Sequence, residues 1–344
     1  MRRVIFITQQ VDPAHPALGA TVSKLQALAE RVDELVVVAD GAVPGALPEN
    51  ARVRRFAAGT KVARGLRFEA ALARELIPRR AAVIAHMCPI YAVLAAPIAR
   101  PLGVPIVLWY THWHASSTLR AATRAATAIA SVDRRSFPLA SSKVRAIGHG
   151  IDLDEFPCRQ RIRHEGLRVL TLGRYSPAKG LDVVLRALRR TVDAGLDVRL
   201  LAHGPVLSPL ERRHRADLDA LVGELRLRSH VELGDAVERS QVRELLAAND
   251  VLVNNMRAGA PDKVVYEAAA SCVPVLASNP VFDTLLPDEF RFPRDDPHAL
   301  ADRLAEFAAL DAEERVTLGR VLRQTVAREH SVDSWAEQML ELAR

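Results

Sequence analysis

A chain of 344 residues is too long for one typical hydrophobic core and suits two domains. Its 49% hydrophobic and 26% charged residues are typical of globular proteins, and no apolar run approaches the roughly 18 residues that cross a membrane. Residues 1–160 carry 21 Lys and Arg against 12 Asp and Glu (+9), and residues 161–344 carry 26 against 29 (−3), which together give the net charge of +6. An anionic partner is therefore expected at the first half. Nucleic acid is not expected there, because the basic residues form no dense run interleaved with aromatic ones.

The cysteines and the first residues bear on the cellular compartment. Cys88, Cys158 and Cys272 are far apart in the sequence and form no CxxC pair. No disulfide framework and no zinc site are therefore expected, which fits a reducing cytoplasm. The opening MRRVIFITQQVDP has too short an apolar run for a signal peptide. The sequence thus predicts a cytoplasmic protein.

Apolar strand patterns alternate with helical patterns in both halves of the chain. In the first half we expect strands at 4–8, 35–39, 53–57, 82–87, 105–112 and 143–150, with helices that include 23–32 and 64–77. In the second half we expect strands at 168–173, 198–204, 230–235, 251–255 and 274–278, with helices at 180–195, 211–227 and 241–250. Near-continuous apolar strands separated by helices indicate parallel sheets covered on both faces, and two such series predict two Rossmann-like domains. Ligands of such sheets bind beyond the carboxyl ends of the strands, so a cleft between the two domains is the expected site.

The segment LGRYSPAKGLDVVLRAL, at 172–188, places two cations in a loop that leads into a helix. Arg174 and Lys179 would add their charge to the helix N-terminus and so attract an anion. The alternative is that both are solvated loop residues. In LLAHGPV, at 200–206, Gly204 follows a strand and would let the backbone approach a flat ligand closely.

The segment PDKVVYEAAASCVPVLA, at 261–277, keeps a lysine and a carboxylate in an alanine-rich helix. Lys263 and Glu267 have the spacing of a surface ion pair. Their apolar neighbours leave little room for a solvated face, so Glu267 is equally a candidate to accept hydrogen bonds from ligand hydroxyls.

Two features of the first half remain. His112 ends the apolar strand in VLWYTHWH and is interpreted as a polar residue of the cleft. His112 and His114 could together suggest a metal site, but no third ligand follows, so no metal is expected. Gly19 precedes a helix, whose backbone N–H groups could bind an anion or a substrate hydroxyl.

Together these segments resemble the retaining GT-B-fold glycosyltransferases of family 4. The resemblance rests on LGRYSPAKGLDVVLRAL and PDKVVYEAAASCVPVLA, with support from LLAHGP, GHGIDLDEF and ITQQVDPAHPALGA, and runs over nearly the whole chain. It implies two Rossmann-like domains that face a cleft: an acceptor domain of residues 1–160 with a returning helix at 330–344, and a donor domain of residues 161–329. It also implies sugar transfer from a nucleoside diphosphate sugar to a hydroxyl acceptor with retained anomeric configuration, by front-face attack and without a metal ion or other cofactor.

The resemblance carries roles over to individual residues. Arg174 and Lys179 look like the pair that binds the donor diphosphate, Glu267 like the carboxylate that holds the ribose, and Gly204 like the turn near the base. Lys263 looks like a secondary cation on the phosphate side. His112 resembles the histidine beside the transferred sugar, and Gly19 the glycine of the acceptor loop.

One departure concerns the Glu-x7-Glu motif of the family. Its first glutamate, which contacts the donor sugar, falls on Gly259. Asp262 or backbone N–H groups of the 259–263 loop are the candidate substitutes. The departure also keeps open an alternative function, a catalytically silent GT-B scaffold that binds a nucleotide sugar or a partner protein. A Rossmann oxidoreductase or epimerase is a weaker alternative, because no GxGxxG follows the first strand.

The basic first domain suggests where such an enzyme would work. In the family this domain binds the acceptor, which is often lipid-linked. Arg64, Arg67, Arg74, Arg79 and Arg80 gather on and just after the helix at 64–77. They are interpreted either as a surface for an anionic membrane, at its inner face, or as a solvated basic face.

Overall fold

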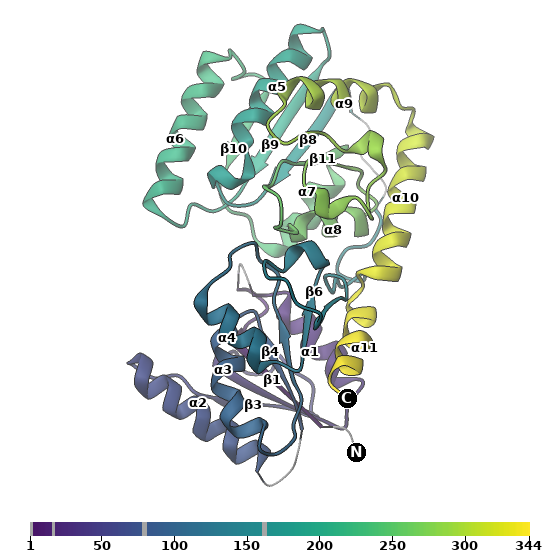
Figure 1. Ribbon diagram of the computed structural model, residues 1–344. Coiled ribbons are helices and arrows are strands. Elements are labelled where there is room, and N and C mark those ends of the chain that lie inside the picture. The colour runs from purple at the N-terminus through teal and green to yellow at the C-terminus, as the bar shows by residue number, and fades with distance from the viewer. Residues whose placement is uncertain (1–2, 16–17, 78–80, 160–163) are drawn as a thin grey trace. The chain divides into compact units, whose positions relative to one another are not determined.

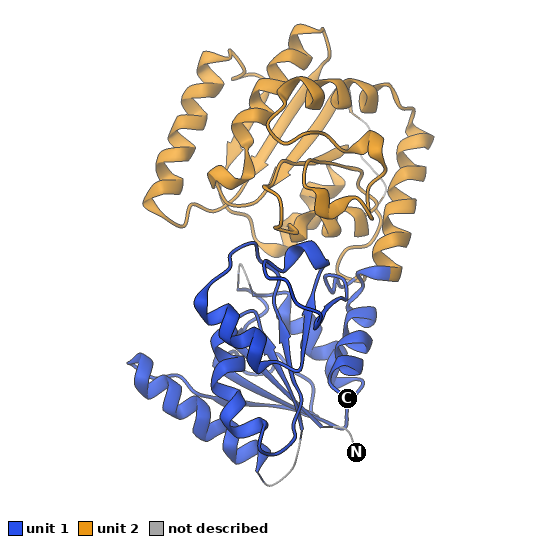
Figure 2. Ribbon diagram, in the orientation of Figure 1, with its two compact units in different colours: residues 1–152, 329–344 blue, residues 153–328 orange. Residues whose placement is uncertain are grey.

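The computed structural model describes residues 3–15, 18–77, 81–159 and 164–344. Two compact units divide the chain (Figure 2). Unit 1 comprises Met1–Asp152 and Glu329–Arg344, and unit 2 comprises Leu153–Arg328. The division therefore falls between Asp152 and Leu153, earlier than residue 160. Arg79 and Arg80 lie outside the described residues.

Unit 1 is a parallel sheet with helices on both faces (Figure 1). Its described strands, in the spatial order β3-β2-β1-β4-β5-β6-β7, are β1 (Arg3–Val11), β2 (Glu34–Ala42), β3 (Ala51–Arg55), β4 (Ala82–His86), β5 (Ile106–Trp109), β6 (Ala128–Ser131) and β7 (Val144–Ala146). Its helices are α1 (Thr21–Ala29), α2 (Lys61–Leu76), α3 (Pro89–Ala99), α4 (Ser117–Ala125) and α11 (Val332–Leu342). The central strands are buried on both faces, as their uninterrupted apolar sequences predict.

Helix α11 returns from the end of the chain to unit 1, where it packs beside α1 (Figure 1). Trp335 is completely buried, and its ring meets that of Trp109 edge-on at 5.6 Å between centroids. Asp333 adds an ion pair with Arg31 at 2.7 Å. The buried contact between Trp335 and Trp109 and the ion pair between Asp333 and Arg31 thus hold α11 against the rest of unit 1.

Unit 2 repeats the same plan around a smaller sheet. Its described strands, in the order β10-β9-β8-β11-β12, are β8 (Leu167–Leu172), β9 (Val198–His203), β10 (Val231–Gly234), β11 (Val251–Asn254) and β12 (Val275–Ala277). Its helices are α5 (Leu181–Asp193), α6 (Pro209–Glu224), α7 (Arg239–Ala247), α8 (Lys263–Ala270), α9 (Pro297–Ala309) and α10 (Ala312–Glu329). Every described strand pair is parallel, so the prediction of two Rossmann-like parallel sheets is confirmed.

The strand order reverses at the first strand of each sheet, which creates a switch point. In unit 2 the connections from β8 and β11, which are neighbours in the sheet, leave in opposite directions. Loops that part in this way leave a crevice at the carboxyl ends of the strands, where ligands of open α/β sheets bind. The loops after Leu172 and Asn254 are therefore where a site is expected in this unit.

The prediction that no disulfide forms was wrong. Cys158 and Cys272 are bonded, with their Cα atoms 5.1 Å apart. Their separation of 114 residues in sequence hides a spatial contact, because residues 153–158 pack on unit 2 near the end of α8. The remaining cysteine, Cys88, is free and half-buried. The argument from cysteine usage for a reducing compartment therefore loses its basis.

Candidate active site

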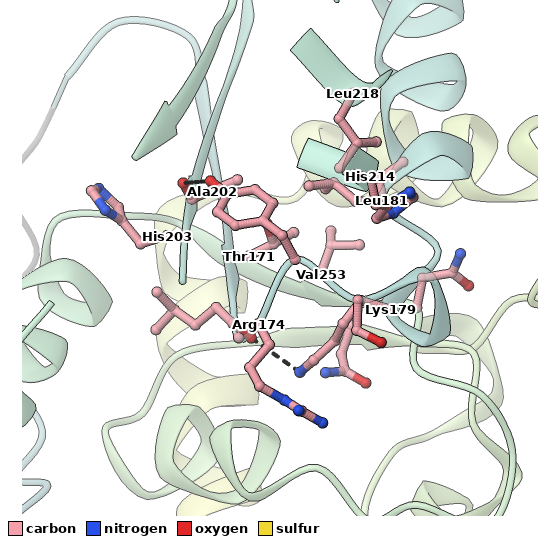
Figure 3. A pocket seen from close by; sticks show the side chains of 16 residues that line it. Thr171, Arg174, Lys179, Leu181, Ala202, His203, His214, Leu218 and Val253 are labelled. Carbon is pink, nitrogen blue, oxygen red and sulfur yellow. Dashed lines mark hydrogen bonds between the residues drawn. The ribbon is translucent and has the colours of Figure 1, made fainter. Parts of the chain in front are cut away.

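The switch point of unit 2 carries a cavity at the carboxyl ends of β8, β9 and β11 (Figure 3). Glycines allow the close approach of its loops. A Cβ atom on Gly204 would collide with the backbone of Gly173, and one on Gly173, whose φ is +135°, would collide with Lys179. Gly180, which directly precedes α5, takes the left-handed conformation with a φ of +56°. The backbone at Gly204 thus lies directly against the loop around 172–180.

Arg174 and Lys179 line this cavity, and Figure 3 shows their side chains extending to the same side of it. The Lys179 ammonium contacts the Asp262 carboxylate and donates to the carbonyl of Leu172 at 3.3 Å. Arg174 is more than half exposed and pairs with Glu211 at 3.3 Å. Each cation is therefore held by a carboxylate that a bound anion could replace.

Polar groups that the sequence analysis missed complete the wall of the cavity. Asn254 donates to Asp262 at 2.7 Å, and Asn255 donates to the carbonyl of Gly180 at 2.9 Å. Tyr175 donates to the carbonyls of Ala202 and Gly234 and so fixes the loop after β8. Burial raises the pKa of Tyr175 to about 12, which keeps its hydroxyl a donor. The two asparagines at the carboxyl end of the apolar strand β11 are the signal that could have revealed Asn254 and Asn255.

Glu267 is 4% exposed, so the solvated ion pair considered above does not describe it. Its Oε1 accepts from the Lys263 ammonium at 2.8 Å and from the Arg239 guanidinium at 3.1 Å. Burial by itself would raise the pKa of Glu267, but the charges of Lys263 and Arg239 outweigh it and hold the pKa below the ordinary value. A buried, ionised carboxylate is thus built into α8.

His112 and Gly19 belong to unit 1. His112 follows β5, is exposed, and its Nδ1 accepts from the backbone N–H of His114 at 3.0 Å. Gly19 sits before α1, where a Cβ would collide with the carbonyls of Pro13 and His15. Within the part of the chain that the structure describes, no three His, Cys, Asp or Glu side chains gather in a group that could hold a metal ion.

In comparison with known proteins, the family match covers most of unit 2. Residues 166–309, in unit 2, match the family described as glycosyl transferases group 1. A curated relative is the putative colanic acid biosynthesis glycosyltransferase WcaL of Escherichia coli K12, 26% identical over 195 residues, which are 54% of this chain. The chain spans about half the length of that relative, 47%.

Solved structures resemble the whole chain. Sucrose-phosphate synthase from Thermosynechococcus elongatus has a TM-score of 0.80 with 18% identity, covering 99% of this chain and 98% of the other. HepE of Anabaena, in complex with UDP and glucose, has a TM-score of 0.77 with 15% identity, covering 99% of both chains. Unit 2 is thus similar in sequence to the group 1 glycosyltransferases, and the whole chain has the GT-B fold of the solved structures.

Proposed function

We propose that this protein transfers a sugar from a nucleoside diphosphate sugar to a hydroxyl group of an acceptor, with retention of anomeric configuration and without a metal ion. The proposal rests on Arg174 and Lys179, two cations at a switch point whose carboxylate partners a diphosphate can replace. The names of similar proteins support it: WcaL is named as a glycosyltransferase, and the HepE structure holds UDP and glucose.

The reaction assigns a task to each cation. The bond between the anomeric carbon and the diphosphate oxygen breaks, and the bond to the acceptor oxygen forms on the same face of the sugar. The proton of the acceptor hydroxyl passes to the leaving diphosphate. Arg174 and Lys179 bind that diphosphate and stabilise the charge it gains in the transition state. His112 and the loop at Gly19 are assigned to the sugar and acceptor side.

Nucleotide recognition is assigned to α8 and the turn at Gly204. Both cations that bind Glu267 reach its Oε1, and no described residue bonds its Oε2. That oxygen is assigned to a ribose hydroxyl, for which a carboxylate is a strong acceptor. Lys263 is kept beside Glu267 and adds positive charge on the phosphate side. Gly204 lets the backbone approach the base.

Asp262 is assigned to the place left by Gly259. It directly precedes α8 and contacts both Lys179 and Asn254, so it can hold the lysine until the donor binds and then face a sugar hydroxyl. The lost glutamate at Gly259 favours a second candidate function, a silent scaffold that binds a nucleotide sugar or a partner protein without turnover. The fate of a nucleotide sugar offered to the protein separates the two.

The nucleotide site can be tested by thermal shift. We expect at least one of the UDP-, GDP-, ADP- and dTDP-sugars to raise the melting temperature of the protein. Lys179→Ala or Glu267→Ala should abolish that rise, because each removes a charged contact worth about 2 kcal/mol. Lys61→Ala, which changes an exposed lysine of unit 1, is the matched control. If both site variants respond to the nucleotide as the unchanged protein does, the site assignment is wrong.

The acceptor is proposed to be lipid-linked and reached from the inner face of an anionic membrane. Helix α2 begins at Lys61, and Thr60 caps it through its side chain. The helix and the residue that follows it carry exposed apolar residues beside exposed arginines. This α2 surface consists of Val62, Leu66 and, just after the helix, Ile77, which are 75%, 63% and 66% exposed, with Arg64, Arg67 and Arg74. Such a stripe suits a bilayer interface. A bilayer-crossing helix was not found in the described parts of the chain.

Membrane binding by the α2 surface is tested with vesicles. We expect the protein to sediment with vesicles of phosphatidylglycerol and much less with phosphatidylcholine, because the arginines attract anionic headgroups. Replacing Val62 and Leu66 together by serine should release it by removing the inserted apolar area. The control replaces Leu207 and Leu210, which are similarly exposed in unit 2. Equal release by both double variants would refute the assignment of the surface to α2.

A further inference from the structure

Arg239 joins three segments of unit 2 that are far apart in the sequence. It is the first residue of α7, and its guanidinium reaches Glu155, in the segment that opens the unit, and Glu267, on α8. Its Nε and Nη2 contact the two oxygens of Glu155 at 2.5 and 2.7 Å. Its Nη1 donates to Oε1 of Glu267 at 3.1 Å. One side chain thus connects the proposed ribose carboxylate to the start of the unit.

The geometry of this contact fixes the orientation of Glu267. A guanidinium is planar and rigid, so its two contacts with Glu155, one of them a hydrogen bond from Nη2, restrict the direction of the N–H groups on Nη1. That N–H and the Lys263 ammonium hold the same oxygen, Oε1. With one oxygen held from two sides, the other, Oε2, has a defined position. The side chain of Arg239 is 27% exposed and the side chain of Glu267 only 6%, so little solvent competes for these contacts.

Glu155 is itself held against α8. Arg323 donates to the carbonyls of Phe156, at 2.6 Å, and Leu153, at 3.4 Å, and also to the carbonyl of Ala270 at the end of α8. The disulfide between Cys158 and Cys272 closes the same contact covalently. The anchor that orients Arg239 is thus fastened to the helix that carries Glu267.

We propose that Arg239 is a positioning residue for nucleotide recognition. It turns Oε2 of Glu267 towards the ribose, so that a nucleotide with ribose hydroxyls binds more tightly than one lacking them. This inference rests on the proposed function, because it takes Glu267 as the ribose ligand. It assigns Arg239 no contact with substrate: its effect reaches the ligand through the carboxylate.

The test compares ligands that differ only in the ribose. Calorimetry would measure the Kd of UDP, 2′-deoxy-UDP and 3′-deoxy-UDP, with the guanosine and adenosine series run in parallel. The unchanged protein should bind at least one ribonucleotide about tenfold more tightly than one of its deoxy forms, as the loss of a charge-assisted hydrogen bond implies. Arg239→Gln should weaken the ribonucleotide about tenfold and leave that deoxy form almost unaffected, so the two dissociation constants converge.

Two further variants keep the test decisive. Arg239→Lys retains the positive charge but lacks the planar set of N–H donors of a guanidinium, so it should also lose ribose preference. Because it keeps the charge, it remains a usable test if Arg239→Gln folds poorly. Arg189→Gln is the matched control, because Arg189 is 26% exposed and paired with Asp193 at 2.6 Å outside the site. Equal weakening of ribo- and deoxynucleotides by Arg239→Gln and Arg239→Lys would show a general structural role and overturn the inference.

Glu267→Gln separates this inference from the proposed function. If that variant keeps ribose preference, Glu267 is not the ribose ligand, and both that assignment and the role of Arg239 fall, whereas sugar transfer assisted by Arg174 and Lys179 is untouched. If no nucleotide binds the unchanged protein, the proposed function falls as well. If Glu267→Gln loses the preference while both Arg239 variants keep it, only the role of Arg239 is refuted. Loss in all three variants, with Arg189→Gln unaffected, supports the inference.

Discussion

Arg174→Ala is expected to lower kcat for sugar transfer by about 100- to 1000-fold, the usual cost of removing a group that stabilises transition-state charge. Arg174 leaves the loop after β8 and is more than half exposed, so its removal opens no cavity in the core. The KM for the donor should change much less than kcat, because the charge on the diphosphate grows as its bond to the sugar breaks. The measurement is the release of nucleoside diphosphate from the donor that the thermal-shift panel identifies.

Arg186→Ala provides the control for this prediction. Arg186 is exposed on α5 and lies outside the residues that line the cavity, so turnover should be unchanged. A decrease common to both variants would point to loss of charge in general rather than to Arg174. If the unchanged protein consumes no nucleoside diphosphate sugar in the presence of any acceptor tested, the silent scaffold becomes the better interpretation.

Glu75→Gln is expected to destabilise unit 1 by about 2–4 kcal/mol, somewhat less than the roughly 3–5 kcal/mol lost when one partner of a fully buried ion pair is removed. Glu75, on α2, is 4% exposed and accepts from Arg3 at 2.6 Å, from Arg54 at 2.8 Å and from Arg52. Arg3 is nearly as buried, so a neutral side chain would leave its charge with less compensation. Arg52 and Arg54 are partly exposed, which places the cost below the largest values for buried pairs.

The dependence on pH gives this prediction a second readout. Hydrogen bonds from Arg52 lower the pKa of Glu75 from 4.5 to about 2. Because the pKa of Glu75 is lower in the folded state than in the unfolded state, its ionised form stabilises the folded protein at every pH above the unfolded-state pKa. That stabilisation is lost as the pH falls from about 4.5 towards 2. The difference between the unchanged protein and Glu75→Gln should therefore be full at pH 7 and shrink through this range.

Urea unfolding followed by tryptophan fluorescence measures the loss of stability of unit 1, which contains Glu75. All three tryptophans, Trp109, Trp113 and Trp335, belong to unit 1, so the signal reports on that unit alone. Glu69→Gln removes a carboxylate from the same helix at a half-exposed position and serves as the control. An unchanged urea midpoint for Glu75→Gln would mean that the ion pairs are compensated by solvation.

The strands and the loop after β8, which carries Arg174 and Lys179, were predictable because their signals are local. The apolar runs at 4–8 and 168–173 correspond to β1 and β8, and the cations Arg174 and Lys179 follow directly after a strand. Strand β6 was not predicted, because its sequence AIAS is short and rich in alanine, which has a weak preference for strands. Local pattern thus gave the architecture except where the pattern itself is faint.

Contacts between distant segments were not predictable in the same way. Nothing in the sequence around Arg239 distinguishes it from the other 46 Lys and Arg residues, because its role depends on Glu155 and Glu267 lying beside it. The disulfide escaped for the same reason, since the spacing of Cys158 and Cys272 follows no motif. Lys263 and Glu267 were recognised as a pair, but their burial became evident only from the packing of α8.

The return of α11 to unit 1 has a consequence for the protein during its synthesis. Unit 2 is one continuous stretch, Leu153–Arg328, whereas unit 1 needs Glu329–Arg344 as well. The ribosome must therefore complete unit 2 before it supplies Trp335, the partner of the fully buried Trp109. We expect the first half of the nascent chain to stay incompletely folded until then, with part of its apolar core exposed and accessible to chaperones. The unit that is begun first is the last to be completed.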